Sequence, residues 1–487
     1  MSERALSMKQ DNRPDFPPQS ASSMYSRWLW LLIGAGVLVI LVGLLRAPLR
    51  GKPGLTVTST DTAGTNVSSG LAMVQPERPR PHRSGAIPTL TAEEIVTSKV
   101  SQFARSRREI VRAIGRRSKT EVPPEVEKFF DAIEAGKWDE IKAQWESLAR
   151  QSGQYENSTN HWADLDPFWP AVLDAYGVAE QAHLWPPQKL LDYGNAVLDS
   201  LRPGMVYVGG TDNGRWIPEL LNETSGGEPH VMLTQNAFAD ARYLDFMNTL
   251  YSDRIITLTS EDSQAVFQNY VTDAQKRLEH DQQFPDEPKQ VRPGEDIQMV
   301  DGKVQVSGAV SVMAINEQLL QSLMQKNPNL SFALEESFPF KGTYGDALPL
   351  GPLMELGAAD AQDGFTAERA AQSLQYWQTT AQQLLGDPEA ADSPTTLKSY
   401  SHDAVAAANL LAAHNFNGEA EQAYRLATQL WPQNPESVSG LADVLAGTGR
   451  ESEARQLLEG FAQQHPDQVK DLERISASWR LVVNSHQ

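Results

Sequence analysis

Matching residues recur at a spacing of 34 near the C-terminus, and this recurrence limits the possible fold more than any other feature of the chain. Small and large apolar residues follow one another at helical spacing in each copy, and a proline comes after them. The matching sets are Ala420, Tyr424, Ala427 and Pro432 in the first copy and Ala454, Leu458, Phe461 and Pro466 in the second. Small residues let two helices cross closely, so the spacing predicts two stacked helical hairpins that pack through these positions.

These hairpins resemble the tetratricopeptide repeat family over residues 401–467. The consensus glycine of the first helix is replaced by alanine, at Ala408 and Ala442. The resemblance implies a concave surface for peptides or partner proteins. Alternatively, two repeats only cap the body of the protein, and the sequence does not decide between these interpretations.

An apolar run without a charge extends from Trp28 to Leu45. As a helix it would be about 27 Å long, close to the hydrocarbon thickness of a bilayer. A buried core helix is rarely apolar on every face. The residues that follow, Leu44-Leu45-Arg46-Ala47-Pro48, make a poor signal-peptide cleavage site. We therefore predict one transmembrane helix at residues 28–46, after an N-terminal tail at 1–27.

The orientation of this helix is less constrained, because positive charges near its two ends are almost balanced. They are Lys9, Arg13 and Arg27 before it and Arg46, Arg50 and Lys52 after it. A short tail before a large body favours insertion with the tail inside. We expect a single-pass protein of a bacterial inner membrane, with an extracytoplasmic, periplasmic body.

Charge is unevenly distributed along the chain. Residues 1–120 carry a balance of +10 and the remainder −30, within a net charge of −20. An acidic body repels phosphate backbones, so nucleic acid is not an expected partner. The basic part adjoins the predicted membrane helix, where anionic headgroups attract it. Cysteine is absent, which excludes disulfides, cysteine-ligated zinc, iron–sulfur clusters and thiol catalysis.

Residues 47–90 are rich in Pro, Gly, Ser and Thr and are predicted to form a flexible linker. Thr91 and Glu94 then form a capping box that opens an arginine-rich helix with an apolar stripe. That helix either touches lipid or an acidic partner, or packs its stripe on the body and leaves a solvated face. We favour the second interpretation. A helical hairpin over 127–150, turning at Gly136, completes a helical juxtamembrane region at 91–160.

Residues 161–360 alternate between predicted helices and short apolar strands. The strands are expected at 205–208, 230–234, 255–259, 310–315 and 331–335. Alternation favours an α/β domain built on a mostly parallel sheet with flanking helices. Residues 361–487 are expected to form the helical, tetratricopeptide-like region.

The loop after the first strand is a candidate ligand site, because ligands bind at the carboxyl ends of such strands. Its candidate residues are Gly209, Gly210, Thr211, Asp212, Asn213 and Arg215. Glycines let a backbone approach a ligand, and a helix N-terminus favours an anion. Asp212 would bind a hydroxyl group or a metal, and Arg215 a phosphate or carboxylate. In the favoured alternative, Thr211 or Asp212 only caps the helix and the glycines make the turn.

The same region resembles the soluble part of bacterial membrane proteins related to the GT-C glycosyltransferases. The order is Leu-Arg-Pro-Gly, an apolar strand, Gly-Gly-Thr-Asp-x-Gly-Arg-aromatic, a helix, a Pro-x-Val strand, Asn, and Tyr-x-Asp. It runs through Leu201, Gly210, Asp212, Pro229, Val231, Asn236, Tyr243 and Asp245. Those relatives carry their catalytic acid in a part with many membrane helices. The resemblance therefore implies a soluble fold with a sugar or ligand cleft, and not the transferase activity.

Other chemical signals are weak. Glu335 and Glu336 would point to opposite sides of a strand and make a poor acid/base pair. Tyr344, Asp346 and the turn-rich 348–352 either line a cleft or form a surface loop, and we favour the surface loop. No metalloprotease, nucleophile-elbow or EF-hand motif is present, and no two histidines are three or four residues apart. The sequence therefore leaves the catalytic residues unknown, and we predict no metal and no cofactor.

Together these features favour a membrane-anchored, non-enzymatic interaction or assembly protein. Its partners would be proteins, such as subunits of a membrane complex, and the membrane itself through Trp28–Leu45. One alternative is a sugar- or anion-binding module, or a glycan-processing enzyme of the cell envelope, with its site at 209–215. Another is a purely structural role inside a membrane complex.

Overall fold

The computed structural model describes residues 90–153, 162–292, 294–300, 303–357 and 364–475. The predicted tail and transmembrane helix, and the predicted linker up to residue 89, lie outside this part of the chain. Among the described residues, no helix is both long enough and apolar enough to span a bilayer.

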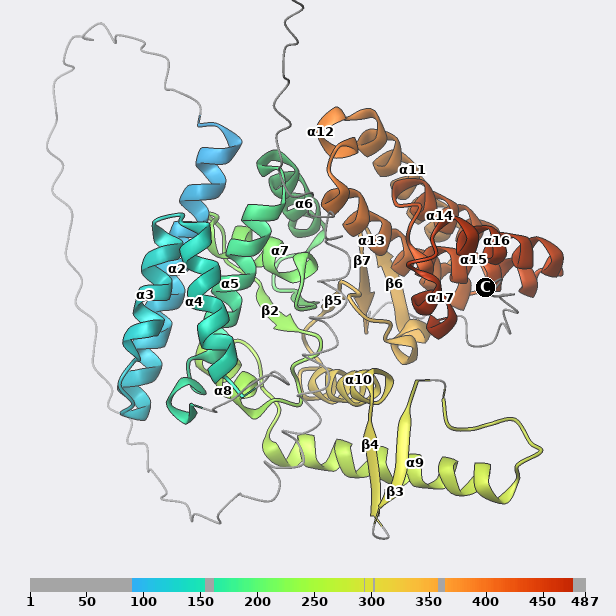
Figure 1. Cartoon of the computed structure of the whole chain (residues 1–487), viewed down its shortest axis with the longest axis horizontal. Coiled ribbons are helices and arrows are strands. Elements are labelled where there is room, and N and C mark those ends of the chain that lie inside the picture. The colour runs from blue at the N-terminus through green and yellow to red at the C-terminus, as the bar shows by residue number, and fades with distance from the viewer. Residues whose placement is uncertain (1–89, 154–161, 293, 301–302, 358–363, 476–487) are drawn as a thin grey trace, which may run out of the picture.

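A helical layer forms the N-terminal side of the molecule (left in Figure 1). Its elements are α2 (Ala92–Ser118), α3 (Pro124–Glu134), α4 (Trp138–Gln151), η1 (Ala163–Leu165), α5 (Trp169–Leu184) and α6 (Pro187–Ser200). The predicted turn between α3 and α4 is confirmed, since Gly136 has a φ of +65° there. The rings of Trp145 and Tyr176 stack 4.1 Å apart and join α4 to α5.

The predicted capping box at the start of α2 is also confirmed. The Thr91 hydroxyl accepts a hydrogen bond from the Glu94 backbone at 3.2 Å, and the Glu94 carboxylate accepts one from the Thr91 backbone at 2.8 Å. Thr91→Ala should therefore lower the free energy of unfolding by about 1 kcal/mol, because it orphans backbone donors of the first turn. Thr97→Ala, on an exposed position inside the same helix, is the matched control in urea denaturation. Equal effects of the two changes would contradict the assignment.

Helix α2 packs on the body through its apolar stripe, as the favoured interpretation expected. Val100, Phe103, Val111 and Ile114 are buried. Its arginines pair with carboxylates of the same chain: Arg108 lies 2.6 Å from Asp131, and Arg112 lies 2.9 Å from Glu127. Pairing within the chain accounts for much of the positive charge of this helix.

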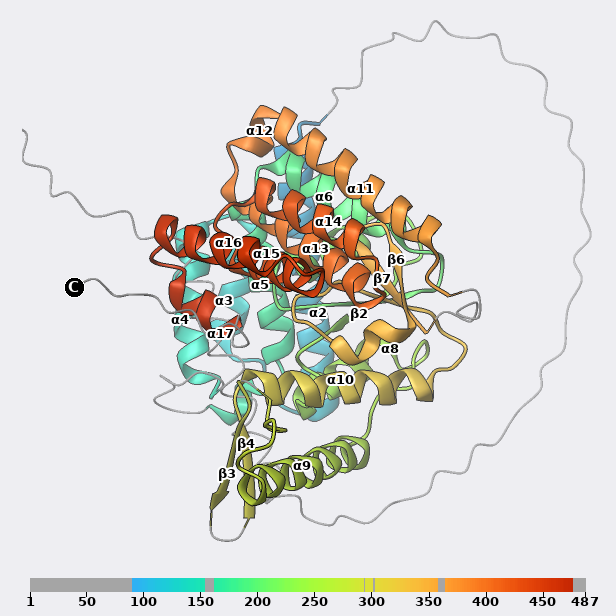
Figure 2. The same cartoon turned by 90° about the vertical axis from the view of Figure 1, so that its right-hand side faces the viewer.

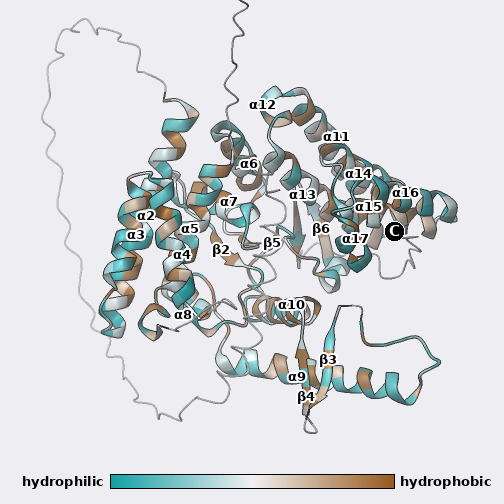
Figure 3. Cartoon of the chain, viewed as in Figure 1, coloured by the Kyte–Doolittle hydropathy of each residue, from teal (hydrophilic) through white to brown (hydrophobic). Residues whose placement is uncertain are grey.

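A five-stranded sheet lies between the helical layer and the C-terminal helices (Figures 1 and 2). Its strands are β1 (Val206–Gly209), β2 (Val231–Thr234), β5 (Phe332–Leu334), β6 (Ala347–Leu350) and β7 (Leu353–Leu356), in the order β2-β1-β5-β7-β6. The strands β2, β1 and β5 are mutually parallel, whereas β7 and β6 are antiparallel additions. The sheet is therefore mixed, and the prediction of a mostly parallel sheet is corrected. Figure 3 shows β2 as strongly hydrophobic.

The antiparallel half was missed because its sequence was interpreted as a surface loop. Residues 347–356 form a tight hairpin whose turn contains Gly351, with a φ of +60°. This left-handed conformation suits glycine and closes a two-residue connection. The hairpin widens the sheet on the side that meets the C-terminal helices.

Two predicted strands are wrong. Residues 310–315 belong to α10 (Ala309–Lys326), because the apolar run continues at helical spacing through Leu319, Leu320 and Leu323, all buried. A short apolar run alone does not distinguish a strand from a buried helix. Residues 255–259 form no strand, since the Asn327 side chain satisfies both backbone groups of Ile256, at 2.8 and 2.9 Å.

The remaining predicted helices are present as α7 (Asn213–Thr224), α8 (Ala241–Tyr251) and α9 (Ser260–Gln283). Helix α9 is mostly hydrophilic and lies with the hairpin β3 (Asp296–Val300) and β4 (Lys303–Ser307) at the bottom of Figure 1. Sequence patterns did not reveal this hairpin. It forms an arm beside α10.

The C-terminal helices form stacked hairpins on the opposite side from α2 to α4. They are α11 (Ala367–Gly386), α12 (Pro388–Ala391), α13 (Pro394–Ala413), α14 (Asn417–Leu430), α15 (Pro435–Gly447), α16 (Glu451–Gln464) and α17 (Val469–Ile475). Ala420, Ala427, Ala454 and Leu458 are fully buried where the helices cross, and Tyr424 and Phe461 are buried beside them. Pro432 and Pro466 follow the ends of α14 and α16.

Candidate functional site

The carboxyl ends of the three parallel strands bring three polar segments together. After β1 the chain runs through Gly210 to Asp212, after β2 through Gln235 and Asn236, and after β5 through Glu335 to Ser337. Backbone bonds hold the segments in register, with the Gln235 amide on the Gly209 carbonyl at 2.7 Å. The Asn236 side chain donates to the Thr211 hydroxyl at 3.3 Å.

Asp212 is the N-cap of α7. Its carboxylate accepts a hydrogen bond from the Gly214 backbone at 3.0 Å, which satisfies an otherwise orphaned donor. The capping interpretation of this loop therefore describes its local geometry. Thr211, Asp212 and Asn213 are partly exposed, whereas Gly209 and Gly210 are buried.

The glycines of the loop admit side chains of the protein itself. A Cβ at Gly210 would lie 2.0 Å from the Ser337 hydroxyl oxygen, and one at Gly214 would lie 2.2 Å from the Glu335 carboxylate. Any side chain at these positions would collide with the segment that follows β5. Close approach is therefore needed, as the sequence indicated, but the approaching group is a protein side chain.

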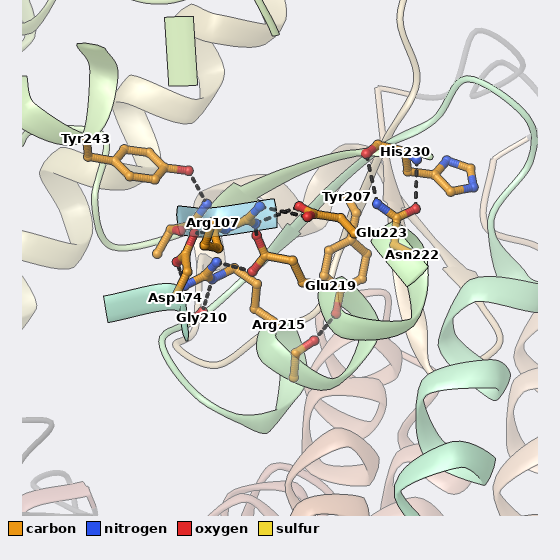
Figure 4. Close-up of polar contacts among 12 residues, drawn as sticks. Arg107, Asp174, Tyr207, Gly210, Arg215, Glu219, Asn222, Glu223, His230 and Tyr243 are labelled. Atoms are coloured by element: carbon orange, nitrogen blue, oxygen red, sulfur yellow. Dashed lines mark hydrogen bonds and ion pairs between the residues drawn. The ribbon is translucent and has the colours of Figure 1, made fainter. Parts of the chain in front are cut away.

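Arg215 lies at the centre of a buried ion network (Figure 4). It is 2% exposed and contacts Asp174 of α5 at 2.9 Å and Glu219 of its own helix. Its Nε donates to the Gly210 carbonyl at 2.9 Å, which ties the helix to the loop before it. Each nitrogen of the guanidinium group therefore donates a hydrogen bond within the protein.

Arg107 of α2 completes the network from the other side. It is fully buried and lies 2.7 Å from Glu219 and 2.6 Å from Glu223. Glu219 accepts from both arginines, one on each oxygen. Burial raises the pKa of Glu219 to about 8, against the opposing attraction of Arg215. The network joins α2, α5 and α7 beneath the sheet.

A second buried cluster lies between the strand ends and α13. Glu335, Glu336 and Asp403 are each less than 5% exposed, and the charge of Asp212 acts on Glu335 and Asp403. The Ser337 hydroxyl donates to Glu335 at 2.8 Å. Burial raises the pKa of Glu336 to about 7 and that of Asp403 to about 7. Burial and the nearby Asp212 raise the pKa of Glu335 well above its usual value.

Sequence reasoning found the loop but missed most of the residues around it. Asp174, Glu219 and Arg107 were not singled out, and neither were His402 and Asp403. One signal was available: Asp174 is an acidic residue within the otherwise apolar stretch 169–179. A charge there requires a partner when the helix is buried on most faces.

The predicted ligand residues of the loop are thus brought together, but Arg215 is already paired. Binding of a ligand at 209–215 remains a prediction. Over the described ranges, no group of three or more His, Cys, Asp or Glu residues has the arrangement of a metal site.

Comparison with known proteins identifies the C-terminal hairpins. The tetratricopeptide repeat family model matches residues 403–475. No curated protein and no solved structure matches the chain. The tetratricopeptide prediction is therefore confirmed for the C-terminal region, whereas the resemblance of residues 201–245 to GT-C-related proteins gains no support. Repeats of this family generally mediate contacts between proteins, which indicates a protein-interaction role.

Proposed function

We propose that this protein is a membrane-anchored interaction protein, in which the α/β body holds tetratricopeptide repeats that bind a partner protein. The membrane would be reached through Trp28–Leu45, and the body would lie on the periplasmic side. The partner would be another subunit of a membrane complex, and the role would be assembly without catalysis. The match of residues 403–475 to the repeat family is the observation that carries this proposal.

The arrangement of the repeats supports binding through the second of them. Helix α13 packs on β6, β7 and η2 (Lys341–Asp346), and α14 packs on α11. The second repeat, α15 and α16, and the following α17 pack mainly on the first repeat and on each other, and extend away from the sheet (Figure 1). The first repeat therefore attaches the C-terminal region to the body, and the second repeat presents its surface outward.

Charge indicates the kind of partner. Residues 435–475 contain eight Asp or Glu residues and four Lys or Arg residues. Surfaces of opposite charge bind selectively and associate faster. We therefore expect a partner with a positively charged contact surface.

Charge reversal on the second repeat tests the proposal. Glu459→Lys/Glu473→Lys changes two exposed residues and should abolish affinity capture of the partner by the detergent-solubilised full-length chain. Glu146→Lys/Glu279→Lys makes the same charge change at exposed positions of α4 and α9 and should leave capture intact. Equal capture by both variants would exclude the second repeat as the binding surface.

The alternative, a sugar- or anion-binding site at 209–215, is not favoured by the geometry. Arg215 would have to leave the buried Asp174 and Glu219 with Arg107 as their remaining cation in order to hold an anion. Leaving buried charges unpaired costs several kcal/mol.

A further inference from the structure

The inner face of α13 holds the chain segment that follows β5. The His402 Nε2 lies 2.9 Å from the Glu336 carbonyl, and the His414 Nε2 lies 2.7 Å from the Tyr344 carbonyl. Asn409 donates to the Glu336 carboxylate at 3.4 Å, and the Tyr344 hydroxyl donates to it at 2.7 Å. This contact, between α13 and residues 335–344, joins the repeats to the body.

Carboxyl groups are concentrated at this contact. Glu335 and Glu336 come from the body, Asp403 comes from α13, and all three are buried. Asp212 adds a fourth carboxyl group from the loop after β1. The cations that act on the cluster are His402 and, at Asp212, Arg215. Arg215 is already shared with Asp174 and Glu219.

Ionising several carboxyl groups in one poorly solvated space costs free energy, because desolvation and mutual repulsion both destabilise the charged form. The docked arrangement therefore retains protons that the same groups would lose in water. His402 is a cation beside this cluster: burial disfavours its charged form, but its contact with Glu436 of α15, at 3.1 Å and within the repeats, outweighs burial and raises its pKa well above the usual value.

We propose that this contact is a proton-dependent latch: the repeats stay docked on the body while the buried carboxyl cluster holds its protons, and undock as the cluster ionises. The inference rests on the proposed function, since it assigns control of the same repeats. Undocking would expose the inner face of α13 and separate the first repeat from β6, β7 and η2.

The other titratable and charged groups around the contact do not oppose the loss of docking that ionisation of the cluster causes. They are Tyr193, Tyr207, Tyr344, Tyr376, Tyr400 and Tyr424, the cations Lys398, Arg215 and Arg474, and Glu436. Burial raises the pKa of each of these tyrosines, so they stay neutral over the pH range in which the buried carboxyl groups titrate. The contact with His402 keeps the pKa of Glu436 below its usual value despite burial, so its charge is constant.

The sign of the pH dependence follows from proton linkage. The docked state binds more protons than the undocked state wherever pH lies between the ordinary carboxyl pKa, about 4, and the raised values near 7. Docking is therefore strongest below about pH 4 and weakens progressively as pH rises from about 4 through about 7. Each proton released weakens the docking equilibrium about tenfold per pH unit.

Fluorescence energy transfer in the full-length chain tests the latch directly. The sequence has no cysteine, so Glu146→Cys on α4 and Gln463→Cys on α16, both exposed, place one dye on the body and one on the second repeat. Transfer efficiency should change progressively between about pH 4 and about pH 8, while the helical circular dichroism signal stays constant.

Variants separate the latch from general effects of pH. Glu335→Gln/Asp403→Asn removes two ionisable groups and should flatten the transition. Glu459→Gln/Glu473→Gln removes two exposed charges of the second repeat and should keep it. If the double latch variant does not fold, Glu336→Gln should reduce the steepness by about one proton.

Three results would overturn the latch: a constant transfer efficiency in the unmutated chain, an identical transition in the latch variants, or loss of helical signal together with the transition. The measurement needs no partner. Its failure therefore leaves the interaction proposal standing, and failure of partner capture leaves the latch standing.

Discussion

Replacing Arg107 by methionine should lower the free energy of unfolding by about 3–5 kcal/mol, the usual cost of breaking a buried ion pair by removing one partner. Arg107 is fully buried and is held by Glu219 and Glu223, and its Nε lies 3.5 Å from Asp174. Methionine fills much of the same volume but leaves Glu219 and Asp174 with Arg215 alone and takes from Glu223 the guanidinium group that holds it. They must then take up protons or remain charged in a poorly solvated site. Urea denaturation followed by tryptophan fluorescence measures the loss.

Arg112→Met is the matched control on the same helix. Arg112 pairs with Glu127 and Glu109, but its side chain is 39% exposed, so water competes for these charges. The control should change stability by less than about 1 kcal/mol. A second variant, Arg107→Met/Glu223→Gln, removes the acid that loses its bidentate arginine and should recover part of the loss. Losses of similar size for Arg107→Met and Arg112→Met would show that the network is not the source of the stability.

The network also shows what the sequence was able to reveal. Helix α2 was recognisable from its capping box and apolar stripe, and helix α7 from the capping residues after a strand. The strands β1, β2 and β5 were recognisable as short apolar runs. The pairing of Arg107 with Glu219, however, joins residues 112 positions apart. Such pairs depend on how the helices pack, and a single sequence does not specify that packing. Arg215 was therefore singled out because it follows a strand, but the residues that pair with it were not identified.

The errors in the sheet have a related cause. Residues 310–315 are apolar except for Ser311, and only the continuation of the pattern through Leu323 distinguishes a helix from a buried strand. Residues 347–356 contain Pro and Gly at the turn, which suggested a loop, although the flanking residues form β6 and β7. The added hairpin matters for function, because it is part of the surface on which α13 docks.

The repeats were predicted more fully because their signal is periodic and local. Packing residues of a hairpin lie within one copy, and the next copy repeats them at a fixed spacing. The packing of the first repeat on the body was not predictable in the same way. His402, Asn409 and His414 are ordinary helix residues in the sequence, and their role depends on residues 336–344, more than 50 positions away.

Gly214→Ala should destabilise the protein by about 1–3 kcal/mol, although alanine is the better helix former. Gly214 lies in the first turn of α7, and the new Cβ would stand 2.2 Å from the Glu335 carboxylate. Glu335 is 3% exposed and is held from behind by its backbone bond to Val208, at 2.8 Å. It therefore has little room to withdraw. Urea denaturation measures the overall loss, and hydrogen exchange in α7 and β5 locates it.

Gly418→Ala is the matched control, because Gly418 lies in the first turn of α14 with no atom within 4 Å of its would-be Cβ. This change should be neutral or stabilising. The pair also separates the two interpretations of the loop. If the glycine serves only to let a ligand approach, Gly214→Ala leaves stability unchanged. If it admits Glu335, the loss appears without any ligand, and a smaller acid at that position, in Gly214→Ala/Glu335→Asp, recovers part of it.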